Sequence, residues 1–363
     1  MNSMKKLSKI LGASVLTFGC LMALPIKAQA TELPSTINWT IPFGVGGGTD
    51  VWARFVAPHL TKNLPGNPTV VIKNQPGGGS ITGTNLFFKR AKSNGEDILG
   101  TSASTLYPFM LGDKRVRYNF DKWIPLMASP TGGVVYVQPD LGVTSSDDIT
   151  KLNGVTLPFG SQSPTGLELP VFLAFEMLGL DIKPVFGMKS RGAGRLAFER
   201  GEAKIDFQTS SAYLGSVVDL VDNKKAVPLF SLGILNNQGE IVRDPAFAEL
   251  PTFEEVYFKK FGKQPSGMEY TAYKKFLAAG FAFQKVIFIP SDTPSDIILT
   301  YQNSVKQMLQ DPAFIKDSEI QVGPYKNVVG IDAAQYLSDA IAVSPELYTW
   351  ISDWLKTKFD YKL

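Results

Sequence analysis

The sequence is poor in the residues that most often carry catalysis or cross-links: its 363 residues include one cysteine and one histidine. Cys20 precedes the expected start of the mature chain, so neither disulfides nor a thiol nucleophile are expected there. His59 follows Pro58 in an expected helix, which favours packing or solvation over a Ser-His-Asp triad. A single histidine excludes a multi-histidine zinc site. Beyond residue 30 no apolar run reaches membrane-spanning length.

The first thirty residues have the three parts of a secretory signal peptide. Lysines begin the segment, residues 10–24 are apolar, and Ala-Gln-Ala at 28–30 is a cleavage signal. We therefore expect cleavage after residue 30 and export to the periplasm, with lipoprotein anchoring at Cys20 as the alternative. Four of the 36 basic residues and none of the 33 acidic ones lie in this segment, which leaves the mature chain a net charge of −1. Nothing in that balance indicates nucleic-acid binding.

The most informative stretch is 40–50, Thr-Ile-Pro-Phe-Gly-Val-Gly-Gly-Gly-Thr-Asp, where an expected strand turns into a helix over about 49–63. Thr49 is a favourable N-cap, and Asp50 suits the positive end of the helix dipole. Backbone N–H groups at such an end attract anions, although a tight connection without a ligand is the alternative. The stretch completes neither the Gly-x-Gly-x-x-Gly nor the Gly-Lys-Ser/Thr pattern of nucleotide-binding loops.

Similar glycine-rich or hydroxyl-rich turns follow other expected strands. One group lies in the first third of the chain and a second group in the middle, at 44–49, 75–80, 102–105, 160–166, 189–192 and 209–213. Strands that alternate with helices predict an α/β fold with parallel sheets, whose strand ends meet at one edge. A carboxylate between the two groups would accept several charge-assisted hydrogen bonds. No metal cluster or activated nucleophile accompanies these turns in the sequence, so binding is favoured over catalysis.

Short motifs also occur in a specific order along nearly the whole mature chain. They are Pro42-Phe43 through Gly47-Gly48-Thr49-Asp50 with Ala53-Arg54, Asn74-Gln75-Pro76-Gly77-Gly78-Gly79, Phe159-Gly160-Ser161, Arg191-Gly192, Arg200-Gly201-Glu202 with Ile205-Asp206, and Thr293-Pro294. In this order and spacing the chain resembles the periplasmic solute-binding receptors of tripartite tricarboxylate transporters, the Bug proteins.

The resemblance implies a two-domain periplasmic-binding-protein fold of type II, the Venus-flytrap fold, with a mostly parallel sheet in each domain. Residues 31–134 and 285–363 would form domain 1, and 135–284 domain 2. Such a receptor is a monomer without cofactor or metal. It closes over a small carboxylate, whether a di- or tricarboxylate or an aromatic acid, and delivers it to integral-membrane permease subunits.

The resemblance also implies where the carboxylate binds. Its ligand groups would be backbone amides and hydroxyls of Phe43, Gly47, Gly48, Thr49, Asp50, Ser161, Ser163 and Thr165. The pocket wall would be completed by Ser102, Ser104 and Tyr213. Apart from the resemblance, Lys189 and Arg191 are the candidates for a compensating positive charge, and the alternative is that both are solvated surface residues. Asp50 would repel a carboxylate, so a role at the helix terminus is the favoured interpretation. Gly44-Val45-Gly46 and Leu167-Glu168-Leu169 depart from the family pattern, which leaves the identity of the carboxylate open.

Two other functions remain as alternatives. The first is a periplasmic hydrolase or isomerase with Ser161 or Asp50 as its reactive group. It is disfavoured because the sequence has no Gly-x-Ser-x-Gly elbow and no suitably placed histidine. The second is a receptor that presents its ligand to a membrane sensor instead of a transporter.

Overall fold

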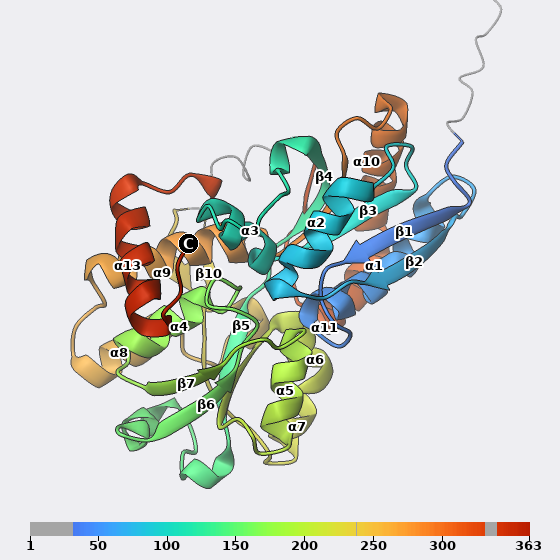
Figure 1. Cartoon of the computed structure of the whole chain (residues 1–363). Helices are drawn as coiled ribbons and strands as arrows, with labels where there is room; N and C mark the ends of the chain where they lie inside the picture. Colours follow the sequence, from blue (N-terminus) through green and yellow to red (C-terminus); the bar gives the residue numbers. More distant parts are fainter. Residues whose placement is uncertain (1–31, 237, 331–339) are drawn as a thin grey trace, which may run out of the picture. The chain divides into compact units, whose positions relative to one another are not determined.

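The computed structural model describes residues 32–236, 238–330 and 340–363. The expected signal peptide and Cys20 lie outside the described residues. The described residues belong to one compact unit, Thr31–Leu363, in which strands and helices alternate as an α/β fold (Figure 1). No helix within these ranges is long and apolar enough to cross a membrane.

The larger sheet has six strands in the order β13-β4-β12-β3-β1-β2. β1 pairs in parallel with β2 and β3, whereas β12 runs antiparallel to β3 and β4, and β13 antiparallel to β4. We call this sheet and the helices packed on it lobe 1. Its strands are β1 (Thr36–Ile41), β2 (Thr69–Asn74), β3 (Asp97–Thr101), β4 (Trp123–Ser129), β12 (Lys285–Pro290) and β13 (Val328–Val329).

The strands between β4 and β12 form smaller sheets. β5 pairs antiparallel with β8 and β9, β6 pairs in parallel with β7, and β10 and β11 form a short antiparallel pair. We call these strands, with α4 to α9, lobe 2. The strands are β5 (Gly133–Val137), β6 (Thr156–Gly160), β7 (Asp181–Val185), β8 (Ile205–Thr209), β9 (Val227–Ser231), β10 (Ile234–Leu235) and β11 (Ile241–Val242).

Helices cover both faces of the larger sheet. Successive side chains of a strand point to opposite faces, so Ile287 and Ile289 of β12 share a core with α1 and α10, whereas Val286 and Phe288 share one with α2 and α3. The helices are α1 (Gly48–Asn63), α2 (Ile81–Arg90), α3 (Ala103–Met110), α4 (Leu169–Met177), α5 (Arg191–Glu199), α6 (Ser210–Ser216), α7 (Val218–Asp222), α8 (Phe253–Phe261), α9 (Gly267–Phe281), α10 (Ser295–Gln310), α11 (Pro312–Gln321) and α13 (Pro345–Phe359).

The α/β class is confirmed, but the sheets are mixed and not mostly parallel as predicted. In the larger sheet β12 and β13 are antiparallel to their neighbours, and in lobe 2 β5 is antiparallel to both of its partners. The physical reason is the connectivity. The chain leaves the larger sheet after β4, builds lobe 2 from β5 onward, and returns as β12 between β3 and β4, so strand direction is set by the passage between lobes and not by successive crossovers.

The chain passes between the lobes at 130–132 and returns at 282–284, just before β12. The C-terminal helix α13 packs against α9, and its Phe359 contacts Phe172 of α4 with 5.0 Å between the ring centroids. This helix therefore contacts helices of lobe 2 although the sequence assigns it to domain 1. The predicted domain limits, 31–134 with 285–363 and 135–284, stay a prediction.

Candidate functional site

The glycine-rich loop connects β1 to α1, which begins at Gly48 with Gly47 as its N-cap. Thr49 therefore lies in the first helical turn and is not the cap that the sequence predicts, because the extended backbone of Gly47 takes that place and no side chain caps the helix. The first N–H groups of a helix have no intrahelical acceptor. This end of α1 can therefore bind an anion where other groups support one.

Asp50 organises the loop from within. Its Oδ2 accepts a hydrogen bond of 2.9 Å from the amide of Gly46, and its Oδ1 lies 2.9 Å from both Arg54 Nη2 and Asn74 Nδ2. The same Asn74 amide donates to the carbonyl of Phe43 at 3.0 Å. The carboxylate is thus bonded to Gly46 of the loop, Arg54 of α1 and Asn74 of β2, and its role at the helix terminus stays a prediction.

The first turn of α1 faces residues of lobe 2 across a small pocket, which we call the cleft pocket. Lobe 1 contributes the end of the glycine-rich loop and the N-cap of α3, lobe 2 contributes three loops, and β12 contributes its first residue. The lining residues are Phe43, Gly47, Gly48, Thr49, Ser102, Gln162, Leu167, Ser190, Arg191, Thr209 and Lys285.

The two lobes touch at the rim of the cleft pocket. The amide of Gly44 donates to the carbonyl of Lys189 at 2.9 Å, and Ser211 Oγ donates to the carbonyl of Gly48 at 3.1 Å. A Cβ added to Gly48 would lie 2.0 Å from Thr209 Oγ1, so only glycine permits this approach. The lobes are therefore closed on each other around the pocket.

Lys285 brings a buried positive charge to the cleft pocket. Its side chain is 2% exposed, and its Nζ lies 3.4 Å from Thr49 Oγ1. No carboxylate within the described residues forms an ion pair with it. Burial lowers the pKa of this ammonium to about 7. This burial is not predictable from the sequence, since a single lysine at the start of an apolar strand is commonly exposed.

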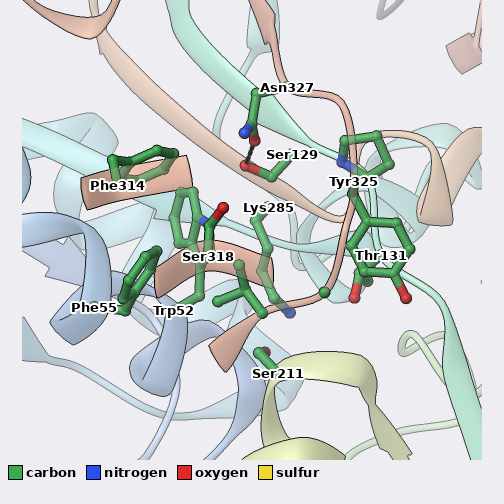
Figure 2. A pocket seen from close by; sticks show the side chains of 13 residues that line it. Trp52, Phe55, Ser129, Thr131, Ser211, Lys285, Phe314, Ser318, Tyr325 and Asn327 are labelled. Atoms are coloured by element: carbon green, nitrogen blue, oxygen red, sulfur yellow. Dashed lines mark hydrogen bonds between the residues drawn. The ribbon is translucent and has the colours of Figure 1, made fainter. Parts of the chain in front are cut away.

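A second pocket, which we call the rear pocket, lies on another side of Lys285 (Figure 2). Figure 2 shows the lysine side chain extended toward Ser211. Other polar groups of this pocket bond to each other or to lobe 2: Ser129 Oγ bonds to Asn327, and the hydroxyl of Tyr325 lies 2.6 Å from Ser210 Oγ. Lys285 is the charged residue among those that line the rear pocket, and no carboxylate in the described residues forms an ion pair with it.

Arg191 lies in the cleft pocket wall, but its charge is already compensated within lobe 2. Its guanidinium forms ion pairs with Glu168, at 3.0 Å, and with Asp206. All three side chains are at least 97% buried, and burial raises the pKa of Asp206 even beside the arginine. Lys189, the other predicted cation, is exposed and contributes its carbonyl oxygen to the lobe contact. Neither residue therefore supplies an uncompensated charge inside the pocket.

The hydroxyl loop after β6 is buried beside the second glycine-rich turn of lobe 1. The Oγ atoms of Ser161 and Ser163 are buried without a hydrogen-bond partner among the described residues. A Cβ on Gly79 would lie 2.8 Å from Ser163 Oγ, so the two turns are in contact. Buried hydroxyls normally find a partner, and these two have the capacity to bind water or a ligand oxygen.

The structure brings together part of the predicted site. Phe43, Gly47, Gly48, Thr49, Ser102 and Arg191 line the cleft pocket. Ser161, Ser163 and Thr165 are buried but do not line it, and Ser104 Oγ is bonded to the amide of Leu167 at 2.8 Å. Tyr213 packs instead against Tyr136 and Phe247 inside lobe 2. The predicted site does not include Gln162, Leu167, Ser190, Thr209 and Lys285. Ser190 and Thr209 nevertheless lie in the turns after expected strands, 189–192 and 209–213, from which other site residues were predicted.

The groups that the enzymatic alternative needs are not assembled. His59 packs against Phe55 and Phe314, its Nε2 lies 3.9 Å from Asp317, and it does not line the cleft pocket. No three histidine, cysteine, aspartate or glutamate side chains in the described ranges are grouped so that they could hold a metal ion.

No family model matches the chain. In sequence it is similar to a UPF0065 protein of Bordetella pertussis, with 26% identity over 313 residues that cover 83% of this chain and 85% of that protein. Protein BugT of the same organism is 35% identical over 104 residues, which cover 29% of this chain and 30% of BugT.

Solved structures show the same fold. The periplasmic binding protein BugD is similar with a TM-score of 0.65 and 17% identity, covering 90% of this chain and 99% of BugD. MatC from Rhodopseudomonas palustris with bound malate has a TM-score of 0.62 and 16% identity, covering 86% and 98% of the two chains. A further R. palustris protein with adipate has a TM-score of 0.64 and 18% identity, covering 86% and 96%.

The fold is therefore that of the periplasmic solute-binding proteins, which the chain shares with BugD and with the two structures that contain malate and adipate. The UPF0065 and BugT sequences and the BugD-like fold together support the Bug-type receptors of tripartite tricarboxylate transporters as the family of this chain.

Proposed function

We propose that the protein is an extracytoplasmic receptor that captures a small carboxylate between its lobes and delivers it to a tripartite tricarboxylate-type transporter. One observation carries the proposal: the uncapped first turn of α1 faces hydroxyl groups of lobe 2 across a closed pocket that also contains a buried ammonium group. Backbone amides, hydroxyls and an ammonium are all hydrogen-bond donors toward an anion.

The chemistry of the pocket favours an anion with a carboxylate at one end. The turn at Gly48 supplies donors on one side, and Thr209 Oγ1, which is buried and has no partner among the described residues, lies on the other. Malate and adipate occupy two of the fold neighbours, and both are dicarboxylates of this kind. We therefore take them as the first ligands to test.

Delivery to a membrane partner is the remaining part of the proposal. Its support is the family resemblance together with the signal-peptide pattern of residues 1–30, which is typical of proteins exported to the periplasm. The transporter would then supply integral-membrane permease subunits that recognise the closed receptor. Cross-linking to membrane proteins in the presence and absence of bound carboxylate would test this step. Capture of a sensor instead of a permease would support the sensory alternative.

Isothermal titration calorimetry of protein recovered from the periplasm tests the binding step. The ligands are malate, adipate, citrate and benzoate, so that di- and tricarboxylates and an aromatic acid are all represented. We expect at least one dissociation constant below about 1 mM, equivalent to about 4 kcal/mol. If none of these acids binds, the proposal is wrong.

A matched ligand controls for charge. Adipamide has the chain length of adipate but carries no carboxylate, so it keeps the apolar contacts and loses the anionic hydrogen bonds. We expect no measurable heat with adipamide under conditions where adipate binds. Equal binding of the two would show that the pocket does not recognise an anion.

A further inference from the structure

Lys285 occupies an unusual position for a lysine. It is the first residue of β12, and Ile287 and Ile289, on the same face of that strand, belong to the apolar core beneath α1. Its Nζ would lie 3.4 Å from a Cβ on Gly48 and lies 3.4 Å from Thr49 Oγ1. The ammonium is thus placed directly at the N-terminus of α1, where the helix dipole is also positive.

Two positive features that face each other make burial of this charge unfavourable. An ammonium removed from water costs several kcal/mol unless an anion accompanies it, and the helix terminus adds repulsion. The residues opposite this end of β12 on the neighbouring strands offer only hydroxyls. Lys285 lies opposite Ser129 of β4, and Val286 lies opposite Thr101 of β3. Ser211 of α6 is likewise neutral.

The acids around the two pockets are already occupied. On α1, Asp50 is bonded to Arg54 and to its own loop. In the wall of lobe 2, Arg191 binds its two carboxylates, as described above. Beside the rear pocket, Asp244 accepts from the hydroxyl of Tyr325 at 2.8 Å and from the amide of Ala246 at 2.9 Å. None of these acids forms an ion pair with Lys285.

We infer that Lys285 pairs directly with the carboxylate of the bound solute, so that the ligand itself completes the ion pair that the protein leaves open. The inference rests on the proposed function and deepens it. In this arrangement the ammonium of Lys285 binds the ligand's carboxylate in addition to the backbone amides of α1. Lys285 is then the residue that selects acids over their neutral or cationic analogues.

A direct pair couples binding to proton uptake. Burial lowers the pKa of Lys285 to about 7 in the unliganded protein, and a carboxylate beside it would raise that pKa again. The liganded state therefore holds more protons than the unliganded state above neutral pH. We expect an uptake of about half a proton per ligand at pH 7, and affinity about tenfold weaker at pH 8 than at pH 6.

Calorimetry with malate and adipate, in buffers of different ionisation enthalpy at pH 6, 7 and 8, measures both effects. Lys285→Met should lose about ten- to hundredfold in affinity and also lose proton uptake and pH dependence. Lys285→Arg keeps a charge that does not titrate in this range, and any binding it retains should not depend on pH. Lys306→Met, an exposed lysine on α10, is the matched control and should behave as the wild type.

The outcomes separate the inference from the proposed function. If the wild type binds malate or adipate and Lys285→Met binds it equally, with the same pH profile, the inference is overturned and the receptor function stands. If the wild type binds no carboxylate, the proposed function fails. The stability of the ligand-free protein then still shows whether Lys285 lacks a counter-ion. Lys285→Met should be at least as stable as the wild type at pH 7, because the methionine needs no counter-ion, and a clear loss of stability would overturn the inference.

Discussion

A single methyl group at Gly48 should prevent the lobes from closing. In the closed structure a Cβ at this position would lie 2.0 Å from Thr209 Oγ1, whereas real Cβ contacts essentially never fall below 3.0 Å. Gly48 belongs to lobe 1 and Thr209 to lobe 2. Gly48→Ala therefore forces the two lobes apart by about an ångström, or displaces the threonine side chain from the pocket.

The cost of that movement follows from the bonds at the rim. Separation by this amount breaks the bond from Ser211 Oγ to the carbonyl of Gly48, at 3.1 Å, and the bond from the amide of Gly44 to the carbonyl of Lys189, at 2.9 Å. Each is worth about 1 kcal/mol net. Closure should therefore lose about 2 kcal/mol, which corresponds to roughly thirtyfold weaker binding of a carboxylate that requires the closed form.

Folding should not suffer from the same change. Gly48 has no positive φ, and alanine is favoured over glycine within a helix by up to about 1 kcal/mol. Thermal unfolding should therefore give Gly48→Ala a midpoint equal to or above that of the wild type, while calorimetry with malate or adipate shows the loss of affinity. A variant that bound as tightly as the wild type would refute the closure argument.

Second-site changes at Thr209 sharpen the test. Thr209→Ala removes the Oγ1 that the new methyl group would meet, so the double variant with Gly48→Ala should regain most of its affinity. Thr209→Ser keeps that oxygen, so the corresponding double variant should stay weak. Equal behaviour of the two double variants would show that the loss at Gly48 has another cause.

Three further predictions concern charge. Arg191→Met leaves Glu168 and Asp206 buried without their cation and should cost about 3–5 kcal/mol in urea unfolding. Asp50→Asn removes the charge shared by three hydrogen bonds of the loop, and it should cost about 1–2 kcal/mol and weaken carboxylate binding in calorimetry. The pKa of Lys285 is about 7 when folded and ordinarily 10.5. The unfolded chain therefore binds more protons between these values, and wild-type stability should rise with pH across that window while Lys285→Met lacks the rise. An equal slope in both proteins, from denaturant unfolding at pH 7 and 9, would contradict the assignment.

The sequence predicted the parts of the fold that local chemistry dictates. Glycine turns after apolar runs located the loop into α1, and the predicted helix over 49–63 differs from Gly48–Asn63 by one residue. The cap was misassigned because Gly47 is extended and Thr49 lies within the first turn. The mixed character of the sheets was also missed, since the direction of a strand depends on how the chain passes between lobes and not on the composition of that strand.

The charges of the site could not be predicted because their partners come from distant segments. Arg191 was expected to meet the ligand, but Glu168 and Asp206, 23 and 15 residues away, already hold its guanidinium. Lys285 meets Thr49 across 236 residues of sequence, so its burial depends on how β12 packs beneath α1. Turns that follow strands predict where hydroxyls and backbone amides gather at a sheet edge. They do not predict which cation there lacks a counter-ion.

The difference between these two cations explains why the site would be selective. Lobe 2 compensates Arg191 with two carboxylates, so its side of the pocket has no positive charge to offer and repels a second acid group placed near Glu168. Lobe 1 offers an ammonium and a helix N-terminus together, and the acid in that first helical turn, Asp50, is already bonded to Gly46, Arg54 and Asn74. An anion bound there relieves repulsion that exists in the ligand-free protein, whereas a cation or a neutral molecule of the same shape does not. Under the proposed function, closure over a carboxylate would be favoured by the charge of lobe 1. Removing that charge at Lys285 should then reduce discrimination between adipate and adipamide more than it reduces the stability of the fold.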